Sequence, residues 1–150
     1  MQTIERFALQ PHQGSPQTDP ADALLIVDGQ VSALRIPGRL LRRQYLTALG
    51  YVLITELDYW VEEAVLVVLV SLDLQRVLAH RTLTRWYSSY YLEEVEWQDD
   101  RHFYLTIEGL EHYRFYFTLR PRHWPLVSPR LGMRCRRLDR KSGKWTFDPW

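Results

Sequence analysis

Two pairs of neighbouring glutamates are the first residues of this sequence that could act as an acid and a base. They are Glu62–Glu63 and Glu93–Glu94. Both pairs fall in extended segments, and adjacent residues of a strand point to opposite faces, so neither pair can bracket one substrate. Glu94 and Glu96 do share a face, about 7 Å apart, but on an open surface where solvent keeps both ionised. We interpret these carboxylates as surface charge.

The residues that bind metals or act as nucleophiles are scattered along the chain. Cys135 is the only cysteine, so an internal disulfide is excluded and zinc ligation is disfavoured. His102 and His112 fall on one predicted sheet face but roughly 20 Å apart, too far to share an ion. No base can be placed beside Ser88–Ser89, and the glycines form no phosphate-binding loop. The sequence therefore predicts no enzyme, no metal site and no cofactor.

The elements that position the polar residues are strands. Residues 51–119 are almost unbroken strand with short polar turns, and residues 64–72 are apolar on both faces, which predicts a central strand. Asp28–Gly29 between two apolar runs predicts a hairpin. Residues 40–49 fit a short helix by spacing, although their neighbours favour a strand. We predict a mainly β protein with little helix: a single-domain antiparallel meander of about eight strands, forming a twisted sheet, a sandwich or a partly closed barrel.

The alternation of residues 90–119 predicts how three of these strands pair, because facing residues share a side and a slip of one residue would expose the apolar set. Residues 109–111 form the turn between the last two strands. The predicted pairs are Ile107 with Tyr113, Leu105 with Phe115, Phe103 with Phe117, Val95 with Leu105, and Trp97 with Phe103. The opposite face then carries Glu96, Tyr104 and Tyr116 in one row, and Glu94, Thr106 and Arg114 in the next.

Charge is divided unevenly along the chain, although the net charge is only +1. Residues 56–100 hold ten acidic and three basic residues, a net charge of −7. Residues 114–150 hold ten basic and two acidic residues, a net charge of +8. Such halves can attract each other within the fold or serve different partners.

The organisation of the chain follows from its composition. Residues 10–22 contain three prolines and no large apolar residue, which predicts that residues 1–22 form a mobile N-terminal tail. Residues 23–150 form a single β domain, in which residues 120–150 are a basic C-terminal extension or hairpin. No signal peptide is recognised, and the longest apolar run is too short for a helix of roughly 20 residues to cross a bilayer. We expect a soluble cytoplasmic protein without a membrane partner.

Several features of residues 39–119 carry a resemblance to a known group of proteins. The features are the Arg39-Leu40-Leu41-Arg42-Arg43-Gln44-Tyr45 entry, Gly50-Tyr51-Val52-Leu53-Ile54-Thr55, the acidic corner ending Glu62-Glu63-Ala64, the apolar strand with its Asp73 turn, and the strand from Tyr87-Ser88-Ser89-Tyr90 to Trp97. About half of the chain thereby resembles small β-rich immunity proteins that are encoded beside polymorphic toxins, including Rhs-type and type VI secretion effectors.

The resemblance implies a non-enzymatic protein that binds one cognate protein toxin, as a one-to-one complex, and neutralises it in the cytoplasm. An acidic, aromatic and rigid surface could cover the basic substrate site of such a toxin. We expect two patches to form the partner-binding surface. The first contains Asp58, Tyr59, Trp60, Glu62 and Glu63, and the second contains Glu94, Glu96, Tyr104 and Tyr116.

Two other functions stay open at this point. A nucleic-acid-binding module would use the basic C-terminal third of the chain, with Trp124 and Trp145 available for stacking. The near-neutral net charge and the acidic face oppose that reading. A hydrolase with an unrecognised site is the third alternative, and an edge strand near Trp145 could also pair with a second copy of the chain. The basic residues concerned are Arg130, Arg134, Arg136, Arg137, Arg140, Lys141 and Lys144.

Overall fold

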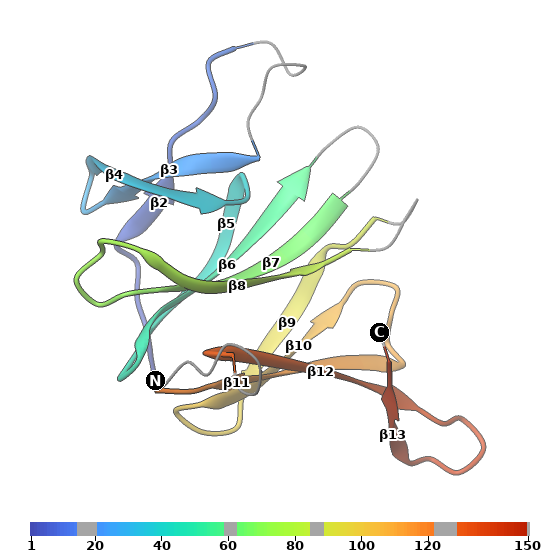
Figure 1. Ribbon diagram of the computed structural model, residues 1–150. Coiled ribbons are helices and arrows are strands. Elements are labelled where there is room, and N and C mark those ends of the chain that lie inside the picture. Colours follow the sequence, from blue (N-terminus) through green and yellow to red (C-terminus); the bar gives the residue numbers. More distant parts are fainter. Residues whose placement is uncertain (15–20, 59–62, 85–88, 122–128, 150) are drawn as a thin grey trace.

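The computed structural model describes residues 1–14, 21–58, 63–84, 89–121 and 129–149, and within them all regular elements are strands. Thirteen strands form three antiparallel sheets that lie in layers (Figure 1). The strands are β1 Gln2–Thr3, β2 Phe7–Leu9, β3 Asp22–Val27, β4 Gln30–Pro37, β5 Leu40–Thr47, β6 Gly50–Asp58, β7 Glu63–Val70, β8 Val77–Leu83, β9 Leu92–Trp97, β10 His102–Ile107, β11 Tyr113–Leu119, β12 Leu131–Leu138 and β13 Trp145–Asp148.

Strands that follow each other in the chain are also neighbours in space. The N-terminal sheet has the order β2-β3-β4, the central sheet β1-β5-β6-β7-β8, and the C-terminal sheet β13-β12-β11-β10-β9. The mainly β fold with little helix is therefore confirmed. Each sheet is a meander of consecutive strands, except that β1 joins the edge of the central sheet beside β5. The described residues contain more strands than the predicted number of about eight, and these strands form three sheets, one more than the sandwich that was among the predicted arrangements.

The central sheet is buried on both faces, which explains why β7 is apolar at every position after Glu63. Val65, Val67 and Leu69 pack against the C-terminal sheet. Leu66 and Val68, on the opposite face, pack beneath the N-terminal sheet. Because a strand alternates its side chains, a strand between two apolar layers needs apolar residues at every position. The predicted central position of this strand is confirmed, since it lies between β6 and β8.

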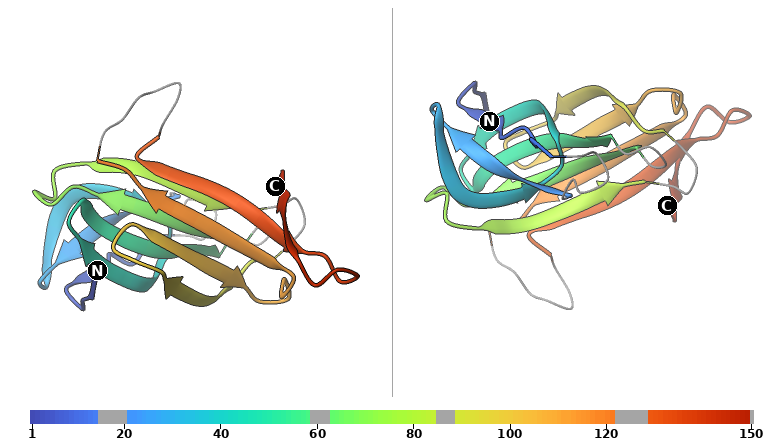
Figure 2. Two further views of the ribbon diagram at one scale, coloured as in Figure 1. Left: turned by 90° about the horizontal axis from the view of Figure 1, so that it is seen from below. Right: turned by 90° about the horizontal axis from the view of Figure 1, so that it is seen from above.

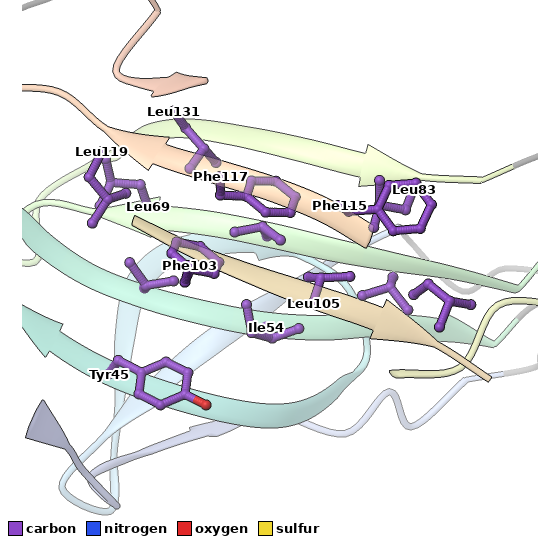
Figure 3. Close-up of a cluster of buried hydrophobic side chains, with 14 of the residues drawn as sticks. Tyr45, Ile54, Leu69, Leu83, Phe103, Leu105, Phe115, Phe117, Leu119 and Leu131 are labelled. Carbon is purple, nitrogen blue, oxygen red and sulfur yellow. The ribbon is translucent and has the colours of Figure 1, made fainter. Parts of the chain in front are cut away.

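Aromatic side chains fill the space between the central and C-terminal sheets (Figure 3). The rings of Phe103 and Phe117 stack with their centroids 5.1 Å apart, and Trp97 lies 4.4 Å from Phe103 on the other side. The rings of Tyr45, from the central sheet, and Trp97 form an edge-on pair with their centroids 5.2 Å apart. Offset and edge-on aromatic pairs of this kind add stability beyond the area that they bury.

The first nine residues belong to the sheets, which differs from the predicted tail. β1 pairs with β5, and β2 pairs with β3. The Gln44 side-chain oxygen accepts the backbone N–H groups of Arg6 and Phe7, both at 2.9 Å. The Phe7 ring is buried against Tyr51, 5.0 Å between centroids. These strands are two and three residues long, too short for the alternation that reveals a strand in a sequence.

The turns that join the strands agree with the sequence in several places. Asp28 and Gly29 both have positive φ, 49° and 82°, as a two-residue hairpin turn of type I′ requires. Residues 40–49, for which a helix and a strand were both considered, contain strand β5. Ser142–Gly143 connects β12 to the edge strand β13, and this hairpin projects beyond the stacked sheets (Figure 2).

Glu56 links the central sheet to the C-terminal sheet through a buried carboxylate. Glu56 as a whole is only 3% exposed. One carboxylate oxygen accepts the backbone N–H of Leu92 at 2.8 Å, and the other accepts from Arg42 Nε at 2.5 Å. Leu92 is the first residue of β9, so this contact fixes where the edge strand of the C-terminal sheet begins.

Replacing a phenylalanine tests whether the two sheets are held together by their apolar interface. Phe115→Ala should lower the free energy of unfolding by about 3–5 kcal/mol, because it removes a fully buried ring and leaves a cavity. Phe147→Ala, the matched control, should change it by less than about 0.5 kcal/mol, because Phe147 is 70% exposed. Urea unfolding followed by tryptophan fluorescence measures both, and equal losses would contradict this packing.

Removing the buried carboxylate tests the link between the sheets. Glu56→Ala should destabilise the protein by about 1–3 kcal/mol, because the Leu92 N–H loses its acceptor inside the protein. Glu111→Ala provides the control, since Glu111 is exposed in the turn between β10 and β11. Urea unfolding of the two variants gives the comparison, and indistinguishable midpoints would show that the Glu56 contacts contribute nothing.

Candidate functional site

The candidate site is the outer face of the C-terminal sheet, defined as the face that points away from the central sheet. One row across it contains Glu96, Tyr104, Tyr116 and Arg134, each the partner of the next in the strand register. A second row begins with the pair Glu94–Thr106 on β9 and β10. It continues with Arg114, Arg136 and Phe147 on β11, β12 and β13.

Most of the predicted register is confirmed. Phe103 faces Phe117 and Leu105 faces Phe115 between β10 and β11. The pairs Trp97–Phe103 and Val95–Leu105 between β9 and β10 are also present. The ladder between β10 and β11 ends at Leu105–Phe115, before the predicted pair Ile107–Tyr113. On the other side of β10, Ile107 pairs with Leu92 across a register shift that leaves the exposed Glu93 as the extra residue of β9.

Tyr104 lies at the centre of the outer face but is only 7% exposed. Its hydroxyl donates a hydrogen bond to the Glu96 carboxylate, and its ring lies 5.3 Å from the Tyr116 ring. The Arg114 guanidinium covers the ring at 4.7 Å from the centroid. Burial, together with the hydrogen bond to Glu96, raises the pKa of Tyr104 to about 12. A binding partner therefore meets the groups that cover Tyr104 rather than the ring itself.

The outer face also carries arginines, which were not among the residues predicted to bind the partner. Arg114 lies between two rings, 4.7 Å from Tyr104 and 4.5 Å from Trp145. Arg136 lies 5.0 Å from the Tyr116 ring. Stacking on an aromatic face orients a guanidinium and leaves its N–H groups directed sideways toward a ligand. The face is thus an ordered array of tyrosines and arginines with glutamates at one side.

Arg114 was predicted on this face, and a signal in the sequence could have found Arg134 and Arg136 as well. Residues 131–136 alternate as a strand, with Cys135 buried and Arg134 and Arg136 exposed. Facing residues of paired strands share a side of the sheet, the rule used above for β9 and β10. Applied to β11 and the strand at residues 131–136, this rule would have placed both arginines beside Tyr116 and Arg114. Strand β12 of the basic C-terminal extension therefore contributes Arg134 and Arg136 to the same face.

Charge changes sign across the outer face. The exposed carboxylates of Glu94 and Glu96 lie on the edge strand β9, and the exposed guanidinium groups of Arg134 and Arg136 lie on β12. Two strands separate β9 from β12, so the two sides are roughly 14 Å apart at the usual spacing of strands. The predicted Glu94, Glu96, Tyr104 and Tyr116 are brought together, but on a face of mixed charge rather than on an acidic one.

The two described residues of the other predicted patch, Asp58 and Glu63, lie elsewhere. Tyr59, Trp60 and Glu62 fall outside the described residues. Asp58 is the last residue of β6 and pairs with Glu63, the first residue of β7. The Glu63 carboxylate accepts a hydrogen bond from Tyr91, and hydrogen bonds from Ser89 and Tyr91 lower the pKa of Glu63. Glu63 therefore belongs to an end of the central sheet and is not part of the outer face.

Residue types with other chemistry give no converging site in the described ranges. No group of three or more His, Cys, Asp or Glu side chains there could hold a metal ion. Burial raises the pKa of the Cys135 thiol to about 12, so the thiol stays protonated at neutral pH. His102 Nδ1 pairs with Asp99 at 2.8 Å.

No helix that is long and apolar enough to span a membrane is found in the residues that the structure describes.

Comparisons of the chain with protein-family models, with curated proteins and with solved structures gave no match. The geometry of the outer face is therefore the basis for the function considered below.

Raising the pH tests the environment of Tyr104. The folded state holds this phenol protonated up to about pH 12, whereas an unfolded tyrosine ionises near pH 10. The stabilising effect is complete below pH 10 and is lost as the pH rises through 12. We expect the free energy of unfolding to fall more steeply between pH 9.5 and 11.5 in the wild type than in Tyr104→Phe. Urea unfolding at a series of pH values measures the two slopes, and identical slopes would contradict the buried position of Tyr104.

Proposed function

We propose that this chain is a non-enzymatic immunity protein, which binds a cognate bacterial toxin in the cytoplasm and neutralises it through the outer face of the C-terminal sheet. The resemblance of residues 39–119 to immunity proteins encoded beside polymorphic toxins supports the class. The observation that carries the proposal is the row Glu96–Tyr104–Tyr116–Arg134, an array of charged and aromatic side chains on an open sheet face.

The acidic side of this face provides a means of inhibition. The carboxylates of Glu94 and Glu96 are exposed on an edge strand, where they can enter a basic cleft that binds the substrate of the toxin. Opposite charges speed the encounter of two proteins, and aromatic residues close to the centre of an interface contribute much of the affinity. The half-buried Tyr116 is the ring of this row that a partner can contact.

The packing beneath the face supports tight binding. Phe103, Phe115 and Phe117 fill the inner side of the same strands and are at most 1% exposed. Side chains that are held in place before binding lose little conformational entropy in the complex. Arg114 and Arg136 are further oriented by the rings on which they lie.

Nucleic-acid binding is the second candidate function, and the arginines favour it. Arg114 lies against Trp145 and pairs with Arg136 on the next strand, and Arg134 lies in the adjacent row, a combination that could hold phosphates and a stacked base. The carboxylates on β9 oppose it, because a strand of phosphates crossing the sheet would meet Glu94 and Glu96. We therefore place a protein partner first.

Charge reversal on β9 tests the proposed function. Glu94→Lys combined with Glu96→Lys should weaken binding to the toxin encoded beside the gene by about 10- to 100-fold, because attraction to the basic cleft becomes repulsion. Most of the loss should be in the association rate and should shrink at high salt. Surface plasmon resonance at two salt concentrations provides the measurement.

A control with the same change of charge makes the result specific. Glu5→Lys combined with Glu108→Lys changes two exposed glutamates that precede β2 and follow β10. This control should keep wild-type affinity and should still protect cells that express the toxin. Full protection by the Glu94/Glu96 variant, or no binding of the toxin by the wild type, would contradict the proposal.

A further inference from the structure

A broad hollow of about 680 Å³ lies over the strands at the arginine-rich side of the C-terminal sheet. Arg81, Arg120, Arg134, Arg136 and His102 contribute to its lining. Arg81 comes from β8, the edge of the central sheet, and the other residues come from the C-terminal sheet or its ends. Among the described residues that line the hollow there is no aspartate or glutamate. His102, one of these lining residues, pairs with the carboxylate of Asp99.

Arg120 is held in position at this hollow. Its guanidinium Nη1 donates to the Pro129 carbonyl at 3.0 Å, and its backbone N–H donates to the Arg130 carbonyl at 2.8 Å. Gly132 leaves the space that the guanidinium occupies, because a Cβ at residue 132 would lie 2.4 Å from Nη1. A glycine in a strand commonly marks such a close approach. The site therefore has a positioned cation, and not only mobile surface charges.

The arginines around the hollow lack anionic partners. Among the described residues, none of Arg81, Arg120, Arg134 and Arg136 forms a salt bridge. Arginines of other sheets do form them, as Arg6 does with Asp28 and Arg42 does with Glu56. Like charges that share a site repel each other, and an anion that enters between them turns this repulsion into charge-assisted hydrogen bonds.

We propose that this hollow binds carboxylates of an acidic segment on the protein partner. The inference rests on the proposed function and adds the second half of its interface. Glu94 and Glu96 lie on the same face, at its other side, so a complementary surface carries a basic patch against β9 and an acidic segment against β11 and β12. A folded protein can present positive and negative charges within roughly 14 Å of each other, which is the distance from β9 to β12.

The same arrangement disfavours nucleic acid as the occupant of the hollow. A single strand of nucleic acid that fills the hollow could continue along the row Arg134–Tyr116–Tyr104–Glu96. Its next phosphates would then approach the carboxylates on β9. The guanidinium of Arg136 already lies over the ring of Tyr116, so a base would have to displace it to stack there, whereas a protein partner can contact the half-buried tyrosine together with this guanidinium. Carboxylates need only the N–H groups at the edges of the guanidinium planes.

The test uses a fluorescein-labelled octaglutamate peptide as the probe and fluorescence anisotropy of the full chain as the readout. Arg120→Gln combined with Arg134→Gln should weaken binding by about tenfold or more, since charge-assisted hydrogen bonds are lost. Gly132→Ala keeps the net charge and displaces the Arg120 guanidinium, so it should weaken binding by about threefold. A twelve-nucleotide single-stranded thymidine oligonucleotide is titrated in parallel.

The control removes the same charge elsewhere. Arg43→Gln combined with Lys141→Gln replaces two exposed cations outside the hollow and should change peptide affinity by less than about twofold. Circular dichroism of each variant establishes that it is folded. If Gly132→Ala does not fold, Arg120→Gln with Arg134→Gln still decides the question.

Three results would overturn the inference. They are no binding of the peptide to the wild type, equal losses in the control and the Arg120/Arg134 variant, and tighter binding of the oligonucleotide that is lost in the same variant. The last would assign the hollow to nucleic acid. The proposed function fails separately: if the peptide binds as expected but the toxin does not, the anion site stands while the immunity function is wrong.

Discussion

The packing of the C-terminal sheet against the central sheet determines what this protein can display. Phe103, Leu105, Phe115 and Phe117 are buried between the two layers, so their strand neighbours must point outward. A slip of one residue would expose four large apolar side chains, which makes the register costly to change. The row from Glu96 to Arg134 is therefore a consequence of the apolar core on the other side of the same strands.

The central sheet gives this arrangement its rigidity. It is covered on one face by the C-terminal sheet and on the other by the N-terminal sheet, and β7 is apolar from Ala64 to Val70 because these residues serve both interfaces. Glu56 joins the layers at the beginning of β9, the strand that carries Glu94 and Glu96. The candidate face thus lies on strands β9 to β12, whose inner side packs against the central sheet, an arrangement that suits recognition of a partner without rearrangement.

Local alternation and turn chemistry revealed much of the fold. The pairing of Phe103 with Phe117 and the turn at Asp28–Gly29 follow from rules that act over a few residues. The partition into three layers could not be predicted this way, because an alternating strand does not specify which sheet covers it. β1 and β2 were missed because their pairing with β5 and β3 depends on contacts distant in sequence, such as those of Gln44 with Phe7.

The candidate site was recovered in part for a related reason. The alternation of side chains along paired strands placed Glu96, Tyr104 and Tyr116 together. Alternation does not reveal which of these side chains is buried, and Tyr104 is covered by Arg114 and Glu96. The net charge of long segments suggested an acidic surface and a separate basic one. Pairing of β11 with β12 instead joins them into one face, since strands from both segments are neighbours in the same sheet.

The central claim is that the outer face of the C-terminal sheet, with both of its charges, contacts the partner. Arginine Nε–H signals in NMR spectra of the full chain test it most directly when the proposed partner toxin is added. We expect the signals of Arg114, Arg134 and Arg136 to shift and those of Arg6 and Arg42 to stay in place. Shifts confined to Arg6 and Arg42, which belong to the other layers, would contradict it.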